Sequence, residues 1–379
     1  MHFRAHAKQI DLFIAGAGPA GLACAIASAL QGLEVHIADA MEPPIDKACG
    51  EGLLPNAIES LASFGIDLAH GPISHQGHSL HGVRFLGNDG ANAQAAFRTH
   101  GRGIRRTILH QLLLDRAIAL GVRLHWKNSV QNIESTPSGV SVRTNRQTIH
   151  ARYLVGADGH HSRVAAWAGL NDVRSHSRRI GLRQHYAIEP WTDFVEVYWS
   201  NFGQAYVTPI SSNEVCVAFT ANKKIRSPQE ALSRFPTLSR HLTLSQPKGS
   251  ARGSITLGRK LRRVTTGNIA LVGDASGSID AITGEGMALC FRHAAALTPA
   301  IKSNVLALYQ QAHRRIQLGP TLMSRSLLLM DRFPLLRDNA LHLFERNPVL
   351  FERLLQLHTG QSPLQLFRLD SQLQPDYTC

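Results

Sequence analysis

Cysteine is scarce and scattered in this sequence. Five cysteines occur in 379 residues, and no two of them form a C-x-x-C pair. This usage argues against a disulfide framework and against a zinc knuckle, and it fits a reducing compartment. H-E-x-x-H and G-x-S-x-G motifs are also missing, which excludes the zinc hydrolase and serine hydrolase classes. We therefore expect no metal site.

Long hydrophobic runs are missing as well. No window reaches about 18 uninterrupted apolar residues, so we expect no segment that spans a bilayer. The basic start and apolar run of residues 1–30 resemble a secretion signal, but the glycines within them indicate the first strand and helix of a fold. We expect a cytoplasmic protein that contacts a membrane peripherally at most.

Acidic residues are few relative to basic ones. The chain has 40 Lys and Arg against 27 Asp and Glu, a formal charge of +13. Residues 221–263 supply +10 of this, because they hold one acid, Glu230, and eleven basic residues: Lys223, Lys224, Arg226, Arg234, Arg240, Lys248, Arg252, Arg259, Lys260, Arg262 and Arg263. A basic surface of this kind indicates an anionic partner or simply a solubilising face. No aromatic interleave accompanies it, so nucleic acid is not expected.

The remaining composition is that of a globular protein of about two domains, with 44% apolar and 18% charged residues. Residues 9–15 and 33–39 are apolar, residues 16–21 are rich in glycine, and residues 22–31 have helical character. Strand, turn, helix and strand in this order predict one βαβ unit.

The later part of the chain changes character twice. Strand patterns dominate from about residue 172 to 260, and amphipathic helical patterns follow from residue 300. Breaks in these helices are expected at three X-Pro pairs: Gly319-Pro320, Phe333-Pro334 and Asn347-Pro348.

A glycine motif lies at the turn of the βαβ unit. Gly16-Ala17-Gly18-Pro19-Ala20-Gly21 fits G-x-G-x-x-G, in which the first glycine makes the turn, the second admits a pyrophosphate and the third allows close helix packing. Asp39 follows 23 residues after Gly16, where a carboxylate can accept a hydrogen bond from a ribose hydroxyl. Together they predict a dinucleotide site, although glycines of an ordinary βα turn remain the alternative.

Two further motifs narrow this prediction. Gly156-Ala157-Asp158-Gly159 and the pair Gly273-Asp274-Ala275 with Gly284-Glu285-Gly286 follow in order along the chain. With the glycine motif, they make residues 8–300 resemble the FAD-dependent monooxygenase superfamily, which has the fold of para-hydroxybenzoate hydroxylase. The resemblance implies an α/β fold with a discontinuous Rossmann-type FAD-binding domain, an inserted antiparallel-sheet substrate domain and C-terminal helices.

The resemblance also implies domain limits. The FAD-binding domain is expected over residues 8–75, 99–171 and 264–300, the substrate-binding sheet domain over residues 76–98 and 172–263, and a helical segment over residues 301–379.

The residues expected to bind FAD by this resemblance are Gly16, Gly18, Pro19, Ala20, Gly21, Asp39, Arg106, Asp158, Gly273, Asp274, Gly284, Glu285 and Gly286. Asp274 would meet the ribityl chain, and residues 284–286 would bring backbone amides and a helix N-terminus to the flavin pyrimidine. Arg106 would meet the pyrophosphate, with Arg105 as its rival. Asp158 would support FAD and the nicotinamide cofactor, or serve only as a helix N-cap.

Within the superfamily, residues 47–53 and 280–286 look most like the geranylgeranyl reductase branch. The first of these segments holds Cys49, a weak catalytic candidate that is equally well explained as a buried structural thiol. Residues 204–209 keep only the proline of the reductase and halogenase motifs at this place. Tyr206 in this segment is a candidate substrate contact or a core residue.

The function implied is that of an FAD-dependent oxidoreductase. We predict a monooxygenase that hydroxylates or oxidises an apolar or aromatic secondary metabolite through a flavin hydroperoxide. The alternatives are an ene-reductase of the geranylgeranyl reductase type, a flavin-dependent halogenase, and a non-catalytic flavin-binding or membrane-associated protein. No second dinucleotide motif occurs, so NAD(P)H or another reductant would bind only transiently.

The expected substrate is a small molecule, which an acidic carrier protein or coenzyme A could deliver. The basic residues beside the substrate domain would then contact the carrier. In that case, charge reversal at Arg259, Arg262 and Arg263 is expected to raise the KM for the tethered substrate more than for the free acid.

Overall fold

The computed structural model describes residues 9–360, except for the side chains of residues 175 and 176. Its first sheet contains β1 (Ile10–Ala15), β2 (Val35–Ala38), β6 (Arg123–His125), β7 (Val130–Thr136), β8 (Gly139–Thr144), β9 (Thr148–Gly156), β15 (Thr265–Thr266) and β16 (Ile269–Leu271). Strands β16, β9, β1, β2 and β6 lie in this order and pair in parallel. This order reverses direction beside β1, which is where Rossmann-type folds bind nucleotides.

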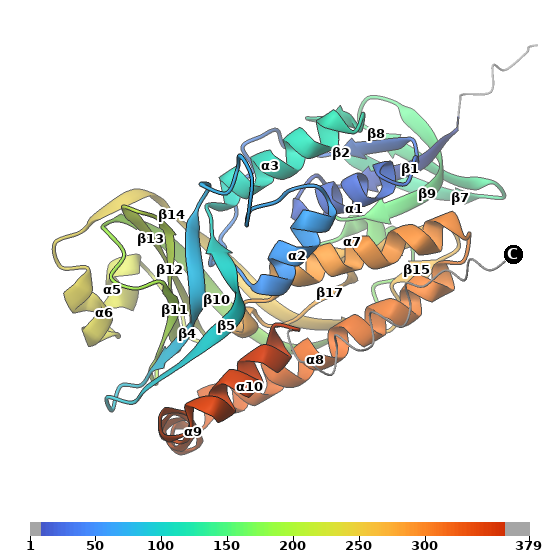
Figure 1. The fold of residues 1–379 in the computed structure, drawn as a ribbon. Helices are drawn as coiled ribbons and strands as arrows, with labels where there is room; N and C mark the ends of the chain where they lie inside the picture. The colour runs from blue at the N-terminus through green and yellow to red at the C-terminus, as the bar shows by residue number, and fades with distance from the viewer. Residues whose placement is uncertain (1–8, 361–379) are drawn as a thin grey trace, which may run out of the picture.

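Helices cover this parallel sheet. They are α1 (Pro19–Ala29), α3 (Arg106–Ala119) and α7 (Gly286–Lys302), with α2 (Pro55–Ser63) packed on α7 and the short α4 (Arg163–Trp167) following β9. Helices α1 and α7 run side by side although they are far apart in the sequence (Figure 1). Helix α1 is almost wholly buried, because its alanines and glycine let it lie close to both the sheet and α7.

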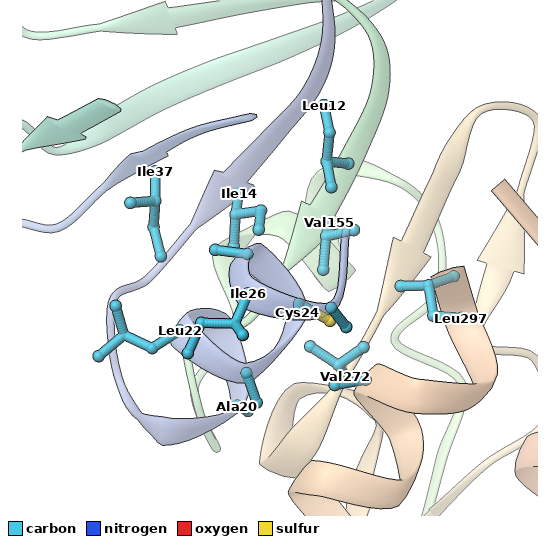
Figure 2. Close-up of a cluster of buried hydrophobic side chains, with 14 of the residues drawn as sticks. Leu12, Ile14, Ala20, Leu22, Cys24, Ile26, Ile37, Val155, Val272 and Leu297 are labelled. Atoms are coloured by element: carbon cyan, nitrogen blue, oxygen red, sulfur yellow. The ribbon is translucent and has the colours of Figure 1, made fainter. Parts of the chain in front are cut away.

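The core of this unit is a tight aliphatic layer. Leu12 and Ile14 of β1, Leu22 and Ile26 of α1, and Leu297 of α7 point into one cluster, in which Cys24 fills the space beside Val272 (Figure 2). Each of these side chains is almost fully buried, and burial of a Leu or Ile side chain stabilises a fold by about 1.5–3 kcal/mol. This layer fixes the ends of β1 and β9 relative to α1 and α7.

The second sheet contains β3 (Gly52–Leu53), β4 (His78–Leu86), β5 (Asn92–Gly103), β10 (Val173–Ala187), β11 (Phe194–Trp199), β12 (Gln204–Ser211), β13 (Glu214–Ala221), β14 (Gln246–Leu261) and β17 (Gly277–Ser278). Its strands pair antiparallel except for β4 with β11. Short helices α5 (Pro228–Leu232) and α6 (Pro236–His241), which the strand-dominated pattern of this region did not predict, lie at one end of the sheet (Figure 1). The α/β fold with a second, largely antiparallel sheet is confirmed.

Three helices follow the sheets: α8 (Leu306–Arg332), α9 (Pro334–Arg346) and α10 (Pro348–His358). The expected breaks before Pro334 and Pro348 are confirmed, but the break at Gly319-Pro320 is wrong, because α8 continues through both residues. A proline inside a helix costs about 3 kcal/mol. Pro320 is buried, and α8 packs on α7, on α9 and on the short helix η2 (Ala281–Thr283). This tertiary packing offsets the cost of the proline.

The C-terminal helices carry most of the exposed large apolar side chains of the described chain, including Leu318, Leu322 and Leu329 of α8. Among residues 9–360, no helix combines the length and the hydrophobicity needed to cross a bilayer. Peripheral membrane contact stays a prediction.

The domain limits also stay a prediction. Two of the expected limits do not coincide with the limits of the sheets. Strand β5 runs across the expected limit at residue 98, and β3 belongs to the second sheet although it lies within residues 8–75. Residue 8 and residues 361–379 lie outside the described part of the chain.

Candidate functional site

The motifs singled out in the sequence follow the carboxyl ends of neighbouring parallel strands. Residues 16–21 follow β1 and Asp39 follows β2. Gly156 is the last residue of β9 and residues 157–159 follow it, and Gly273 begins η1 (Gly273–Ser276) shortly after β16. Because β16, β9, β1 and β2 are consecutive in the sheet, these segments meet at one edge. This edge is the place where open α/β sheets bind ligands.

The first glycine motif is packed directly against the other two. A Cβ added at Gly21 would lie 1.9 Å from the Gly16 carbonyl oxygen, and one added at Gly16 would lie 2.5 Å from the Ala157 carbonyl oxygen. Gly16 also has a φ of 106°, which only glycine adopts without strain. A Cβ at Gly273 would lie 2.7 Å from Ala20 Cβ. The structure therefore brings the three motifs together.

Other glycines of the same motifs face open space. A Cβ added at Gly18, Gly284 or Gly286 would have no atom within 4 Å. Gly18 precedes α1, and Pro19 occupies the first position of that helix, so backbone amides of a helix N-terminus face this space. Gly284 and Gly286 stand in the same way before and at the start of α7. Close packing on one side and room on the other are what a bound nucleotide requires.

Asp39 and His110 hold the glycine loop from two sides. The Asp39 carboxylate accepts a hydrogen bond from the Ala17 N–H at 2.8 Å, and His110 Nε2 lies 2.9 Å from the Ala17 carbonyl oxygen. Burial lowers the pKa of His110, so a neutral ring donates to that carbonyl. A carboxylate has about four acceptor sites, and Asp39 therefore keeps capacity for the predicted ribose hydroxyl.

Arg106, at the first position of α3, is the cation of this edge. It is buried, and its Nε has no hydrogen-bond partner among the described residues. Its positive charge is close enough to act downward on the pKa values of Cys49, His110 and Cys290 of α7. Arg106 therefore lies between residues 49–53 and the glycine loop. A buried guanidinium nitrogen without a partner fits an anionic group such as a pyrophosphate. Arg105, the rival, is instead paired with Glu214.

Glu51 organises the N-terminus of α3. Arg105 precedes this helix and supplies no side-chain cap, and the Glu51 carboxylate accepts the Arg106 N–H at 3.1 Å in its place. Its other oxygen lies 2.6 Å from His185 Nε2. Glu51 is 4% exposed and has a φ of 60°, an uncommon conformation for a residue with a side chain. The loop conformation thus aims the carboxylate at α3.

Glu51, His185 and Cys216 have donor types that zinc accepts, and their ligand atoms lie within 4.8 Å of one another. Ligands of a tetrahedral zinc ion lie roughly 3.3 Å apart, given metal bonds of about 2.0 Å, whereas Glu51 and His185 are 2.6 Å apart. Arg183 Nη1 is 3.0 Å from His185 Nδ1. Because arginine only donates, Nδ1 accepts and Nε2 carries the proton. We therefore interpret the cluster as hydrogen-bonded.

The remaining predicted side chains have partners of their own. Asp158 accepts hydrogen bonds from Ser162 Oγ and from the Arg163 and Val164 N–H groups, so its carboxylate caps α4, and a cofactor contact stays a prediction. Asp274 is exposed, with one oxygen 3.0 Å from His160 Nδ1, and is free to meet a hydroxyl as well. Burial raises the pKa of the Cys49 thiol, which favours a structural role.

The loop before α7 is tied to the second sheet. Asp280 accepts the Ile282 N–H at 3.1 Å and the Ser177 hydroxyl at 2.7 Å, and Arg179 Nη1 lies 3.5 Å from it. Tyr206, predicted as a substrate contact, donates its hydroxyl to the Ile282 carbonyl at 3.0 Å. The loop that carries Gly284 and Gly286 is therefore positioned by residues of β10 and β12.

Helix α10 contacts this loop through its last residue. His358 Nε2 lies 3.0 Å from the Thr283 carbonyl oxygen, and Nδ1 lies 3.3 Å from Glu285 Oε2. Burial raises the pKa of Glu285 to about 8 and lowers that of His358 to about 4. At neutral pH both groups are therefore mostly uncharged, and the His358 N–H donates to Thr283. The Glu285 side chain faces α10, while its backbone stays at the head of α7.

This pair predicts that stability declines as the pH rises from about 6.5 to about 8. Between pH 6.5, the ordinary His pKa, and pH 8, folded Glu285 retains a proton that the unfolded chain has lost, so the free energy of unfolding falls as pH rises. Below pH 6.5, His358 works in the opposite direction, because the unfolded chain binds a proton that the folded chain lacks. Urea unfolding at a series of pH values should show that the free energy of unfolding of the wild type falls between pH 6.5 and pH 8. Glu285→Gln should show a smaller fall over the same range.

The exposed Glu189 provides the matched control for this measurement. Glu189→Gln should keep the wild-type slope. Identical slopes for all three proteins would contradict the neutral state of Glu285.

Sequence reasoning missed several residues of this edge. His110, His185, Cys216 and His358 reach it from elements far along the chain, and no local motif marks them. Glu51 lay inside a segment already singled out, residues 47–53, where an acid between two glycines was the available signal.

The sequence model of the protein family described as FAD binding domain matches residues 9–307. The menaquinone reductase of Mycolicibacterium smegmatis is 27% identical over 305 residues, which cover 74% of this chain and 73% of that protein. Digeranylgeranylglycerophospholipid reductase 1 of Methanothermobacter thermautotrophicus is 26% identical over 302 residues, again 74% of this chain and 73% of that protein.

Similarity extends to other flavoproteins. An FAD-dependent monooxygenase of Aspergillus terreus is 28% identical over 187 residues, 43% of this chain and 25% of that protein. Among solved structures, the flavin-dependent brominase Bmp2 has a TM-score of 0.80 at 17% identity, over 96% of this chain and 98% of that chain. At that identity the likeness shows the fold alone. The predicted superfamily and its FAD cofactor are confirmed.

Proposed function

Because the chain belongs to the FAD-binding domain family and is an FAD-dependent oxidoreductase, we propose that it is a monooxygenase for an apolar or aromatic small molecule. Bound FAD supplies two-electron chemistry and, once reduced, reacts with O2. The residues that fit the cofactor are those of the strand-end edge: Gly18, Gly284 and Gly286, which face open space, and Arg106, whose buried Nε has no partner among the described residues.

The observation that supports an apolar or aromatic substrate is an apolar cluster beside the loop that carries Gly284 and Gly286. Ile282, two residues before Gly284, is buried in the same cluster as Leu54, which follows β3, and Trp199 of β11. Phe85 packs edge-on against Trp199, with ring centroids 5.7 Å apart. This apolar wall lies beside the loop that carries Gly284 and Gly286, where it would exclude water and favour an apolar substrate.

One polar atom in this wall has no partner. Trp199 is 1% exposed, and its indole N–H makes no hydrogen bond with the described residues. A buried donor without an acceptor costs about 1–3 kcal/mol, which a substrate oxygen would recover. This favours an apolar molecule that carries a hydroxyl or carbonyl group.

Double-bond reduction is the second candidate. It is supported by the two reductases, each of which aligns with about three quarters of this chain, whereas the monooxygenase relative aligns with less than half. Halogenation has weaker support, since the brominase likeness extends to the fold only and no lysine can be assigned to that chemistry.

An assay of oxygen demand separates the two candidates. Holoenzyme, NAD(P)H and a lipid extract from a strain lacking this protein would be incubated in air and without O2. Monooxygenation predicts O2 uptake coupled to NAD(P)H oxidation and a product heavier by one oxygen atom, formed only in air. A product heavier by two hydrogen atoms, formed equally without O2, would overturn the proposal in favour of reduction.

A further inference from the structure

A cavity of about 400 Å³ lies on the second sheet, away from the strand-end edge. It is lined by Asn88 of the β4–β5 turn, by Ser200, Asn201 and Phe202 of the β11–β12 turn, and by Lys223, Lys224, Glu230 and Arg234 between β13 and α6. Three segments that are distant in sequence thus meet at the end of the sheet near α5 (Figure 1). Its size is within the range of sites for small organic ligands.

The charges around this cavity are unbalanced. Lys223, Lys224 and Arg234 are cations for which the described residues provide no carboxylate partner, and the one acid, Glu230, already accepts the Arg226 N–H at 3.0 Å. Other cations between residues 221 and 263 do have carboxylate partners: Lys248 is 2.9 Å from Glu214, and Arg252 is 3.3 Å from Asp46. Lys248 and Arg252 of the basic segment are therefore paired with carboxylates, whereas the three cations at the cavity are not.

Two of the lining residues are held in place. The Arg234 guanidinium lies 5.8 Å from the centre of the Phe202 ring, a cation–π contact that reduces its freedom at the wall. Asn201 Oδ1 accepts a hydrogen bond from Arg337 Nη2 at 3.1 Å, which leaves the Asn201 amide N–H groups as donors on the cavity side.

Arg337 lies behind Asn201 and holds it in place. This residue of α9 is 3% exposed, and its Nη1 has no hydrogen-bond partner among the described residues. A buried guanidinium nitrogen without an acceptor is costly, and it stands directly behind Asn201. Arg337 does not line the cavity, and its Nε donates to Asp338 at 2.7 Å, so it supports the cavity wall through Asn201.

We propose that this cavity binds the phosphate group of a small organic ligand. A phosphate dianion offers three acceptor oxygens, enough for two ammonium groups and a guanidinium together. The cavity exceeds the needs of free phosphate, and Phe202 supplies an apolar surface for the organic part. Two sources carry this chemistry: the phosphopantetheine arm of a tethered substrate, and a nicotinamide dinucleotide phosphate.

The site that the sequence suggested for a tether is different. Arg259 Nη1 donates to the His160 carbonyl and is thereby engaged within the fold. Arg262 and Arg263 are exposed neighbours elsewhere on the basic segment. They form a matched control, because reversing both changes the charge by the same amount as reversing Lys223 and Lys224.

Calorimetric titration of the holoenzyme tests this site with three probes: coenzyme A, NADPH and inorganic phosphate. We expect coenzyme A or NADPH to bind the wild type, with a Kd raised at least about tenfold, or 1.4 kcal/mol, in K223E/K224E and in R234A. R262E/R263E should change the Kd less than about twofold, and K223R/K224R should retain binding. The organic probe that binds identifies the source of the phosphate.

Three results would overturn the proposal: no binding of either organic probe, binding that survives K223E/K224E, or equal losses in K223E/K224E and R262E/R263E, which would indicate only the general positive field. Binding of inorganic phosphate alone would also contradict it. The FAD content of each variant shows whether the flavin site is intact, so failure here is separate from failure of the proposed oxygenation.

Discussion

Gly21→Ala should destabilise the protein by about 2–3 kcal/mol, although alanine is the better helix former by about 1 kcal/mol. The added methyl group would lie 1.9 Å from the Gly16 carbonyl oxygen and 3.2 Å from Ala157 Cβ. Neither neighbour can move freely, because Gly16 holds a φ of 106° against the Ala157 backbone. Urea unfolding of the apoprotein measures the loss, and reduced FAD binding should accompany it.

Gly18→Ala is the matched variant, with the same chemical change three residues away. Gly18 has a φ of −70°, which alanine tolerates, and no atom lies within 4 Å of the added methyl group. The stability of the apoprotein should change by less than about 0.5 kcal/mol. The Kd for FAD should nevertheless rise at least about tenfold, since the methyl group occupies the space through which backbone approaches the pyrophosphate. Unchanged FAD affinity in Gly18→Ala would show that the cofactor does not lie there.

Glu51→Ala should cost about 2–4 kcal/mol of stability and weaken FAD binding as well. The substitution leaves the Arg106 N–H and the His185 Nε2–H, both buried, without their acceptor. His185 cannot adapt by moving its proton, because Arg183 donates to Nδ1. The loss at the start of α3 also releases Arg106, the cation expected to meet the pyrophosphate. Urea unfolding and FAD titration measure the two effects.

Glu51→Gln keeps the shape of the side chain but replaces one of its two acceptor oxygens with an amide nitrogen. The amide oxygen can serve one of the two donors, but the amide N–H groups then face the other, so an intermediate loss of about 1–2 kcal/mol is expected. Exposed Glu134 provides the control, and Glu134→Ala should stay within about 0.5 kcal/mol of the wild type. A Glu51→Ala protein as stable as Glu134→Ala would refute the capping role.

The strand-end edge could be predicted from the sequence because its signals are local. Glycines between an apolar strand and a helix, and acids at the ends of strands, specify a βα turn within a few residues, and the parallel order of β9, β1 and β2 places such turns together. Asp39 and Gly18 are examples: each was predicted from its spacing, and each lies at this edge.

Contacts between distant segments were beyond such reasoning. The hydrogen bond between Glu51 and His185 joins residues 134 positions apart, and no sequence pattern around either residue indicates it. Pro320 inside α8 shows the opposite failure, in which a strong local signal lost to tertiary packing. The basic segment was visible as a charge excess, but which of its cations are paired depends on where Asp46 and Glu214 fold.

We propose that this flavoprotein inserts oxygen into an apolar substrate. The most direct test is turnover under isotopically heavy O2, with holoenzyme, NAD(P)H and the lipid extract, followed by mass spectrometry of the product. We expect one labelled oxygen atom in the product, and we expect Gly18→Ala to lower the product yield together with FAD occupancy. A product that gains two hydrogen atoms and no label would contradict it.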